Sequence, residues 1–340
     1  MAVADVALTA RARGVASHLL SRGALEELSA VPDLATLARR LAITGVVHDT
    51  PAGPLDVFAV ERAAAHGAET QLRILCGWQG SATGPLQVFL ADVDRRSLRA
   101  VLRGAAQGAP RELRLRGLLP TPLLPSAVLA LLAALTSPQA VVHELLARRY
   151  PDAERLLPAA GQTASDLLAI EAALLDGFVR RAACASASTD RPLHEFVVES
   201  IDVGNAINAL LVAGDPRDAD PGALFVEGGR WLTRDTFAAA VSTRARHLAA
   251  GVLAAACVRS PLAAILTEGS ADVARIERAF LETTLLRLQR AARRDPLSTA
   301  PVLRVLLLIA VQIRDLRALA WGAALAVPPT ARSRQLVTPR

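Results

Sequence analysis

The sequence predicts an all-α protein, and composition and pattern both lead to that prediction. Hydrophobic residues make up 52% of the 340 residues and aromatic residues only 3%, so leucine, alanine and valine must build the core. Leucine and alanine are strong helix formers. Runs in which apolar and polar residues alternate, as half-buried strands require, are nearly missing. Most segments instead repeat their apolar residues at helical spacing, with proline, glycine or small polar residues at the joints.

The first helices are expected close to the N-terminus. One runs from about Val3 to Leu20, and Ser21 can cap the next helix. Asp33, which follows Pro32, starts a third helix in the stretch LATLARRLAI. The remaining helices are expected at Val57–Cys76, Leu86–Arg103, Ser126–Leu135, Gln139–Arg149, Ala164–Ala183, His194–Ala213, Arg234–Ala256, Asp272–Arg294 and Pro296–Ala326.

The stretch from Asp295 to Pro329 resembles a membrane span at first reading. Its uninterrupted apolar run, Val305–Val311, would rise only about 10 Å as a helix, against roughly 30 Å of bilayer hydrocarbon. Each charge on either side of that run would cost roughly 2.5 to 3.5 kcal/mol in lipid. We therefore expect a helix of a soluble protein that starts at Asp295 and Pro296. Its first half should be core, and its second half, with Gln312 and Asp315, should present polar groups to a neighbour or to solvent.

Three helices share a pattern that indicates an internal repeat. In each, an apolar segment leads to a polar residue, a second polar residue follows three positions later, and a leucine-rich turn and a glycine come next. The matched pairs are Asp94 with Ser97, Asp202 with Asn205 and, in a weaker copy, Gln312 with Asp315. The copies lie about 110 residues apart, too far for the usual solenoid repeats of about 20 to 50 residues. The sequence therefore predicts three related helical units at residues 1–136, 137–244 and 245–340.

The repeated acidic residues can be interpreted in two ways. They could make charged contacts with a partner, or they could be carboxylates that are hydrogen-bonded between packed helices. We favour the second interpretation and assign Asp94, Asp202 and Asn205 to a structural helix motif.

No group of residues predicts catalysis, cofactor binding or metal binding. A GxxxxGK[ST] phosphate loop needs a lysine, and the chain contains none. The six histidines lie singly, without the i, i+4 spacing of a helical zinc site. The acidic stretch DPRDAD at 215–220 contains proline and lies between predicted helices, so a solvated loop is expected there and not a magnesium site.

Charge and cysteine content limit which partners and which cellular compartment the sequence predicts. The formal net charge is +6, but the arginines are not interleaved with aromatic residues as a single-strand groove requires, so no nucleic-acid partner is predicted. The three cysteines, Cys76, Cys184 and Cys257, are expected to be buried free thiols of a reducing compartment. The N-terminal stretch lacks the apolar run of a secretory signal, which predicts a cytoplasmic protein with only peripheral membrane contact.

Several stretches together resemble one known family. The stretch IERAFLETTLLRLQRAARRDPLSTAPVLRVLLLIAVQIRDLRALAWGAALAVPP resembles the C-terminal part of the C/d family of V/A-type (vacuolar/archaeal-type) ATPase subunits, which belong to the central rotor stalk. The opening LTARARGVASHLLSRGALEELSAVPDLATLARRLAIT is similar to that family's N-terminal arginine-containing helix and the two short helices after it. DRRSLRAVLRG and DVGNAINALLVAG resemble its repeated Asp-x-x-Asn-leucine helix, and LFVEGGRWLT its glycine turn. The chain departs from the family's Lys-Glu pair and Arg-Asn-Leu-Arg sequence, because it has Ala310 and Gln312 in that region and Asp315 in place of the asparagine.

The resemblance implies three similar helical-bundle domains in a pseudo-threefold, funnel-shaped arrangement. A protein of this family is a non-catalytic, cofactor-free part of the central stalk on the cytoplasmic face of the membrane. It accepts the rotor shaft and couples it to the proteolipid ring. In the two terminal helices that the resemblance brings into one assembly, Arg11, Arg13, Arg314 and Arg317 are the predicted partner contacts.

Two other functions fit the same composition. A generic α-helical scaffold or adaptor would also lack catalytic residues, and neighbouring genes for nucleotide-binding and proteolipid subunits would argue against it. An all-α lyase or prenyl-transferring enzyme would need carboxylates clustered around an apolar pocket, which a magnesium titration would detect.

Overall fold

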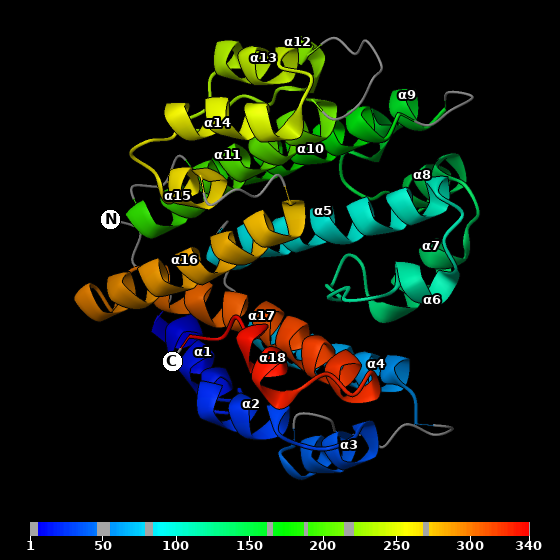
Figure 1. Ribbon diagram of the computed structural model, residues 1–340, viewed down its shortest axis with the longest axis vertical. Coiled ribbons are helices and arrows are strands. Elements are labelled where there is room, and N and C mark those ends of the chain that lie inside the picture. Colours follow the sequence, from blue (N-terminus) through cyan, green and yellow to red (C-terminus); the bar gives the residue numbers. More distant parts are fainter. Residues whose placement is uncertain are drawn as a thin grey trace. The chain divides into compact units, whose positions relative to one another are not determined.

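The computed structural model of the chain consists of helices and the segments that join them (Figure 1). It describes residues 6–45, 55–78, 84–161, 166–186, 190–213, 221–267 and 272–339. These ranges contain no strand, which confirms the all-α prediction.

The helices follow one another with short connections. The first half of the chain holds α1 (Val6–Ala16), α2 (Arg22–Ser29), α3 (Leu34–Ile43), α4 (Val57–Cys76), α5 (Pro85–Ala106), α6 (Arg111–Arg114), α7 (Ser126–Ala134) and α8 (Pro138–Ala147). The second half holds the 3₁₀ turn η1 (Ala153–Leu156), α9 (Leu157–Ala160), α10 (Leu167–Ser186), α11 (Arg191–Ala213), α12 (Pro221–Leu224), α13 (Arg234–Ser242), α14 (Arg246–Ala256), α15 (Pro261–Thr267), α16 (Val273–Arg294), α17 (Ala300–Ala324) and α18 (Pro329–Arg334).

Polar side chains fix where the N-terminal helices begin. Ser21 accepts the N–H of Ala24 at the start of α2, and Asp33 accepts the N–H of Thr36 at the start of α3. The cap at Ser21 was predicted from the sequence, and the helix expected after Asp33 does start there. Each satisfies one of the donors that a helix start leaves open.

The chain divides into two compact units. Of the described residues, unit 1 contains those of 98–108 and 135–284, and unit 2 contains those of 6–97, 109–134 and 285–339. The division falls inside α5 and α16, so each unit takes part of both helices. The division into three units at 1–136, 137–244 and 245–340 stays a prediction.

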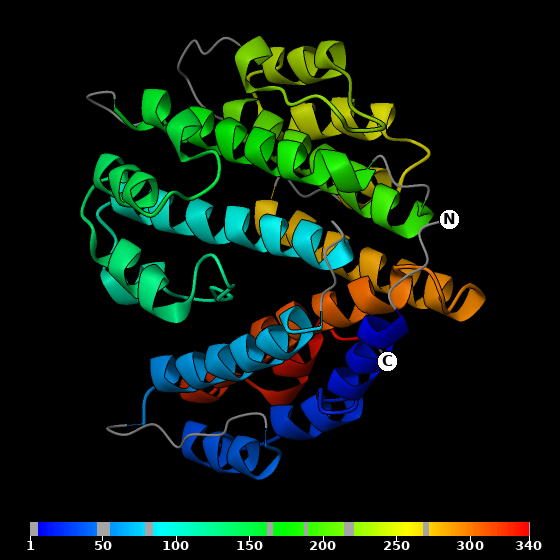
Figure 2. The ribbon, with the colours of Figure 1, turned by 180° about the vertical axis from the view of Figure 1, so that it is seen from behind.

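Helix α17 is the centre of unit 2. It packs against α1, α2, α3 and α4, and its contact with α4 can be followed from behind in Figure 2. Leu316 and Leu319 of α17 share a buried cluster with Leu25, Leu37 and Leu41 of the N-terminal helices. The expected core helix is therefore present, packed within its own unit.

Helix α11 has the same central place in unit 1, where it packs against α10, α13 and α14. Val203, Ile207 and Leu210 of α11 join Phe237 of α13 and Leu253 of α14 in one buried cluster. Among the described residues, α11 is the one helix whose length and apolarity would suffice to cross a membrane, and 89% of its most apolar window is buried. That burial is typical of a core helix.

Most predicted helices begin or end a few residues from their bounds in the structure, and two of the differences have a local cause. The helix expected from Pro296 begins instead at Ala300, because the Asp295 carboxylate accepts the N–H of Leu297 and the Asp295 carbonyl accepts the hydroxyl of Ser298, which closes a local turn. The single helix expected at 234–256 is two helices, because the chain turns at Arg244, whose φ of 52° lies in the left-handed region.

Candidate functional site

A buried carboxylate on α11 holds the loop that returns to this helix. Asp202 is 1% exposed and accepts the backbone N–H groups of Arg230, Trp231 and Leu232 at 2.9 to 3.2 Å. Burial raises the pKa of Asp202, although the three N–H donors and the Arg230 charge act in the opposite direction. The loop can approach this closely because Gly229 has no Cβ, and a Cβ there would collide with the Asp202 carboxylate.

Asn205, one turn farther along α11, binds the same loop by a second contact. Its Oδ1 accepts the N–H of Val226 at 3.0 Å, and its Nδ2 donates to the carbonyl of Val226 at 2.7 Å. The amide therefore satisfies both backbone groups of one buried residue. Together with Asp202, it fixes both ends of the glycine turn.

Helix α5 holds its own returning segment with a carboxylate at the matching position. Asp94 is 1% exposed and accepts the hydroxyl of Thr121, a residue 27 positions later. The same hydroxyl oxygen accepts the N–H of Leu124 and so closes the turn. Asp92, on the same helix, is also buried. Its burial acts to raise its pKa, but the charges of Arg96 and Arg95 prevail and lower the pKa of Asp92.

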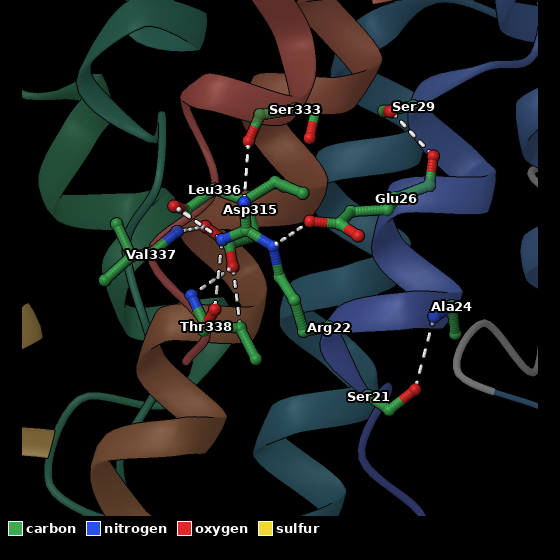
Figure 3. A network of polar contacts seen from close by, with 10 residues as sticks. All are labelled: Ser21, Arg22, Ala24, Glu26, Ser29, Asp315, Ser333, Leu336, Val337 and Thr338. Carbon is green, nitrogen blue, oxygen red and sulfur yellow. Dashed lines mark hydrogen bonds and ion pairs between the residues drawn. The ribbon is translucent and has the colours of Figure 1, made fainter. Parts of the chain in front are cut away.

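Helix α17 holds the C-terminal segment in the same manner, through Asp315 (Figure 3). This carboxylate is 0% exposed and accepts the N–H of Val337 at 2.8 Å, and the N–H and hydroxyl of Thr338 at 2.9 and 2.7 Å. The expectation that Asp315 and Gln312 face a neighbour or solvent is wrong. Gln312 is also buried, and its Oε1 accepts the N–H of Leu20.

Arg22 of α2 completes this contact from the other side (Figure 3). Its guanidinium donates to the carbonyls of Ser333, Leu336 and Thr338 and pairs with Glu26 at 2.8 Å. The two ends of the described chain are thus joined on α17 by one polar network, which we call the terminal clasp: Arg22, Glu26, Asp315, Ser333, Leu336, Val337 and Thr338.

Asp94, Asp202, Asn205 and Asp315 each bind a segment that follows their own helix, and the spacing of these contacts fits the alignment of the three helices. Asn205 binds a residue 21 positions later and Asp315 binds residues 22 and 23 positions later, while Asp94 and Asp202 bind residues 27 to 30 positions later. That Asp94, Asp202 and Asn205 form a structural motif stays a prediction, which substitution of Asp202 can test.

The four arginines predicted to contact partners lie on the two helices expected. Arg11 and Arg13 are exposed on α1, and the Arg11 guanidinium lies 4.3 Å from the ring centre of Trp78. Arg314 and Arg317 are half-buried on α17, which packs against α1. The Arg317 guanidinium lies so close to Gly117 that a Cβ at that glycine would displace it. The first pair is therefore accessible to a large partner, and the second pair less so.

Arg317 also lines a cavity of about 610 Å³ in unit 2 that the sequence does not predict. Its walls come from α4, α6, α7, α17 and the segment after α6, and they combine apolar side chains with charges of both signs. The lining residues are Phe58, Glu61, Arg62, Ala65, His66, Arg111, Glu112, Leu115, Gly117, Leu118, Pro120, Ser126, Ala127, Leu129, Ala130, Ile313 and Arg317. No sequence motif marks them, since they come from four helices that only the fold brings together.

The described residues offer no group that would hold a metal ion. The stretch DPRDAD at 215–220 and His48 lie outside the described residues. Burial raises the pKa of the Cys257 thiol to about 12, with a further contribution from Asp202, and burial also raises the pKa of the half-buried Cys76. The thiolate is the nucleophilic form, so neither cysteine is activated. The side chain of Cys184 is outside the described part.

A family model described as the ATP synthase (C/AC39) subunit matches residues 8–334. No curated protein matches the chain. Because the match extends over nearly the whole sequence, the chain belongs to the ATP synthase (C/AC39) subunit family of the V/A-type rotary ATPases.

Proposed function

We propose that the chain is a non-catalytic central-stalk subunit of a V/A-type ATPase or ATP synthase. It forms a socket that couples the rotor shaft to the membrane proteolipid ring during ATP-linked ion transport. The observation that carries the proposal is the family match over residues 8–334, which includes both termini of the helical core.

The way unit 2 is held together supports a role in transmitting load. A coupling element must resist shear, and shear acts most directly on chain ends and on helices that are attached at one end only. In unit 2 the terminal clasp joins α2 and the C-terminal segment to the central α17. A second bond, from Arg332 to the Val31 carbonyl at 2.8 Å, adds a further connection between the two ends. A load on either end would be shared with the core.

The three-domain arrangement around a funnel is part of the same proposal, with units at 1–136, 137–244 and 245–340. It is supported by the similar way in which α5, α11 and α17 bind the segments that follow them. One bonding scheme that recurs on three helices is what duplication of a single unit would leave.

We place the protein on the cytoplasmic face, in peripheral contact with the membrane. The formal net charge of +6 favours approach to an anionic headgroup layer. Neither a nucleic acid nor a cofactor is part of the proposal. The partners are the shaft subunits and the proteolipid ring.

The exposed arginines of α1 are the part of the proposed interface that is easiest to test. We expect Arg11→Glu combined with Arg13→Glu to reduce capture of the shaft or the ring roughly tenfold at low salt, because both side chains would repel acidic partner groups. Pull-down of each partner at low and moderate salt measures the effect. Loss of the Arg11 contact with Trp78 costs only about 0.5 to 1 kcal/mol, so the fold should persist.

The matched control is Arg39→Glu combined with Arg40→Glu, which makes the same charge change on exposed positions of α3. It should leave capture unchanged. Equal capture by the wild type and the α1 variant at both salt concentrations would show that these arginines are only solvated charge.

A further inference from the structure

Unit 2 contains a second cavity, of about 520 Å³, beside the terminal clasp. It lies where α1 ends, α2 begins and the first half of α17 passes the C-terminal segment. The lining residues are Ala16, Leu19, Leu20, Ser21, Arg22, Gly23, Glu26, Arg304, Leu308, Gln312, Thr338 and Pro339. This volume falls in the range of small-molecule sites.

One side chain in its wall is a cation without a counterion among the described residues. Arg304 is half-buried on α17, and its Nε is buried with no hydrogen-bond partner. It forms no ion pair with any residue that the structure describes. Burial and the like charge of Arg293 both lower the pKa of Arg304, so its surroundings disfavour the charged form. A guanidinium in this setting gains from an anion more than a solvated one does.

The other charged groups of the cavity are already engaged with each other. Glu26 is the carboxylate of the wall, but it pairs with Arg22 at 2.8 Å. The rest of the Arg22 guanidinium is used on the carbonyls of Ser333, Leu336 and Thr338. Glu26 is therefore neutralised by Arg22, and the charges of the described wall residues leave Arg304 without an acidic partner.

Further hydrogen-bond donors line the same cavity. Gln312 uses its Oε1 on the N–H of Leu20, which leaves its Nε2 as a donor. The first turn of α2 begins at the cavity, and the N–H groups of Arg22 and Gly23 have no acceptor within the helix. A tetrahedral oxyanion can accept bonds from several such directions at once, whereas the planar carboxylate is matched best by one guanidinium edge.

We propose that this cavity binds a phosphate group through Arg304, with the donors of Gln312 and of the α2 start around it. The volume exceeds what a single oxyanion fills, so the phosphate would be carried by a larger molecule, either a soluble phosphate ester or the headgroup of a lipid. This proposal does not depend on the coupling function, because the cavity could bind phosphate even if the chain bound neither the shaft nor the ring.

Titration of the full chain with inorganic phosphate, at constant ionic strength in chloride, tests the site by calorimetry. We expect saturable binding with one site per chain. Arg304→Gln should weaken it roughly tenfold to a hundredfold, the range for loss of a charged hydrogen-bond donor. The matched control, Arg294→Gln, removes an exposed arginine that does not line the cavity and should bind as the wild type does.

Thermal melting without phosphate separates a binding residue from a structural one. Arg304→Gln should melt at the same temperature as the wild type or higher, because it removes an uncompensated, partly desolvated charge. Phosphate should raise the melting temperature of the wild type and of Arg294→Gln, but not that of Arg304→Gln. A lower melting temperature for Arg304→Gln in the absence of phosphate would assign Arg304 to the fold and overturn the proposal.

Binding to lipid vesicles distinguishes a lipid headgroup from a soluble phosphate ester as the source of the phosphate. Vesicles of phosphatidylcholine with phosphatidic acid should retain the wild type and lose Arg304→Gln if a lipid headgroup enters the site. Equal retention of the two proteins, together with loss of inorganic phosphate binding in the variant, assigns the site to a soluble phosphate ester. No saturable phosphate binding by the wild type, or equal binding by all three proteins, would overturn the proposal.

Discussion

Asp202→Ala is expected to lower the free energy of unfolding by about 3 kcal/mol, because the backbone N–H groups of Arg230, Trp231 and Leu232 lose their shared acceptor. Leu232 is buried, so water cannot replace the lost bond there without opening the loop. Urea denaturation followed by circular dichroism measures the change. Capture of partners should decline only to the extent that the fold is lost.

Two variants control this experiment. Asp202→Asn keeps one acceptor oxygen and should lose less stability than the alanine variant. Glu227→Ala removes an exposed carboxylate from the same loop, whose pair with Arg234 is worth less than about 1 kcal/mol. If Asp202→Ala were no less stable than Glu227→Ala, the carboxylate would not be structural, and a partner contact would be the better interpretation.

Asp315→Ala is expected to release the C-terminal segment from α17. Its carboxylate accepts three bonds from Val337 and Thr338, and without it the bonds of Arg22 and of Arg332 to the rest of unit 2 would remain. We expect a loss of about 3 kcal/mol, from buried donors left without an acceptor. In Asp315→Ala, hydrogen exchange should show the amides of Val337 and Thr338 exchanging faster than in the wild type, and faster than the amides in the core of α11.

Glu27→Ala is the matched control for the terminal clasp, because Glu27 is exposed on α2 and takes no part in it. It should leave both stability and exchange unchanged. Protection of Val337 and Thr338 that persists in Asp315→Ala would mean that the carboxylate does not hold the segment.

Local sequence signals account for most of the fold. The predicted range Val57–Cys76 coincides with α4, because Asp56 caps its start and a glycine follows its end. The cap at Ser21 and the helix start at Asp33 are as predicted for the same reason. Such signals act within one helical turn, so the sequence alone displays them. The low aromatic content and the missing strand patterns were sufficient for the fold class.

The parts that the sequence does not predict depend on contacts between distant segments. Arg22 bonds to Leu336 across 314 positions, and the partner of Asp315 lies beyond a further helix, so neither contact leaves a local pattern. The one local signal is an aspartate within an otherwise apolar helix, which at Asp315 predicts a polar face and not a buried contact. Both cavities have walls from several helices, and the uncompensated charge of Arg304 is visible only once those helices are packed.

ATP-driven ion transport by membrane vesicles that carry the ATPase, with and without this chain, tests the coupling proposal most directly. We predict that vesicles lacking the chain hydrolyse ATP but do not transport ions, and that adding the purified chain restores transport. A partial recovery with the α1 arginine variant would place Arg11 and Arg13 at the interface. Equal ion transport with and without the chain would contradict the proposed coupling role.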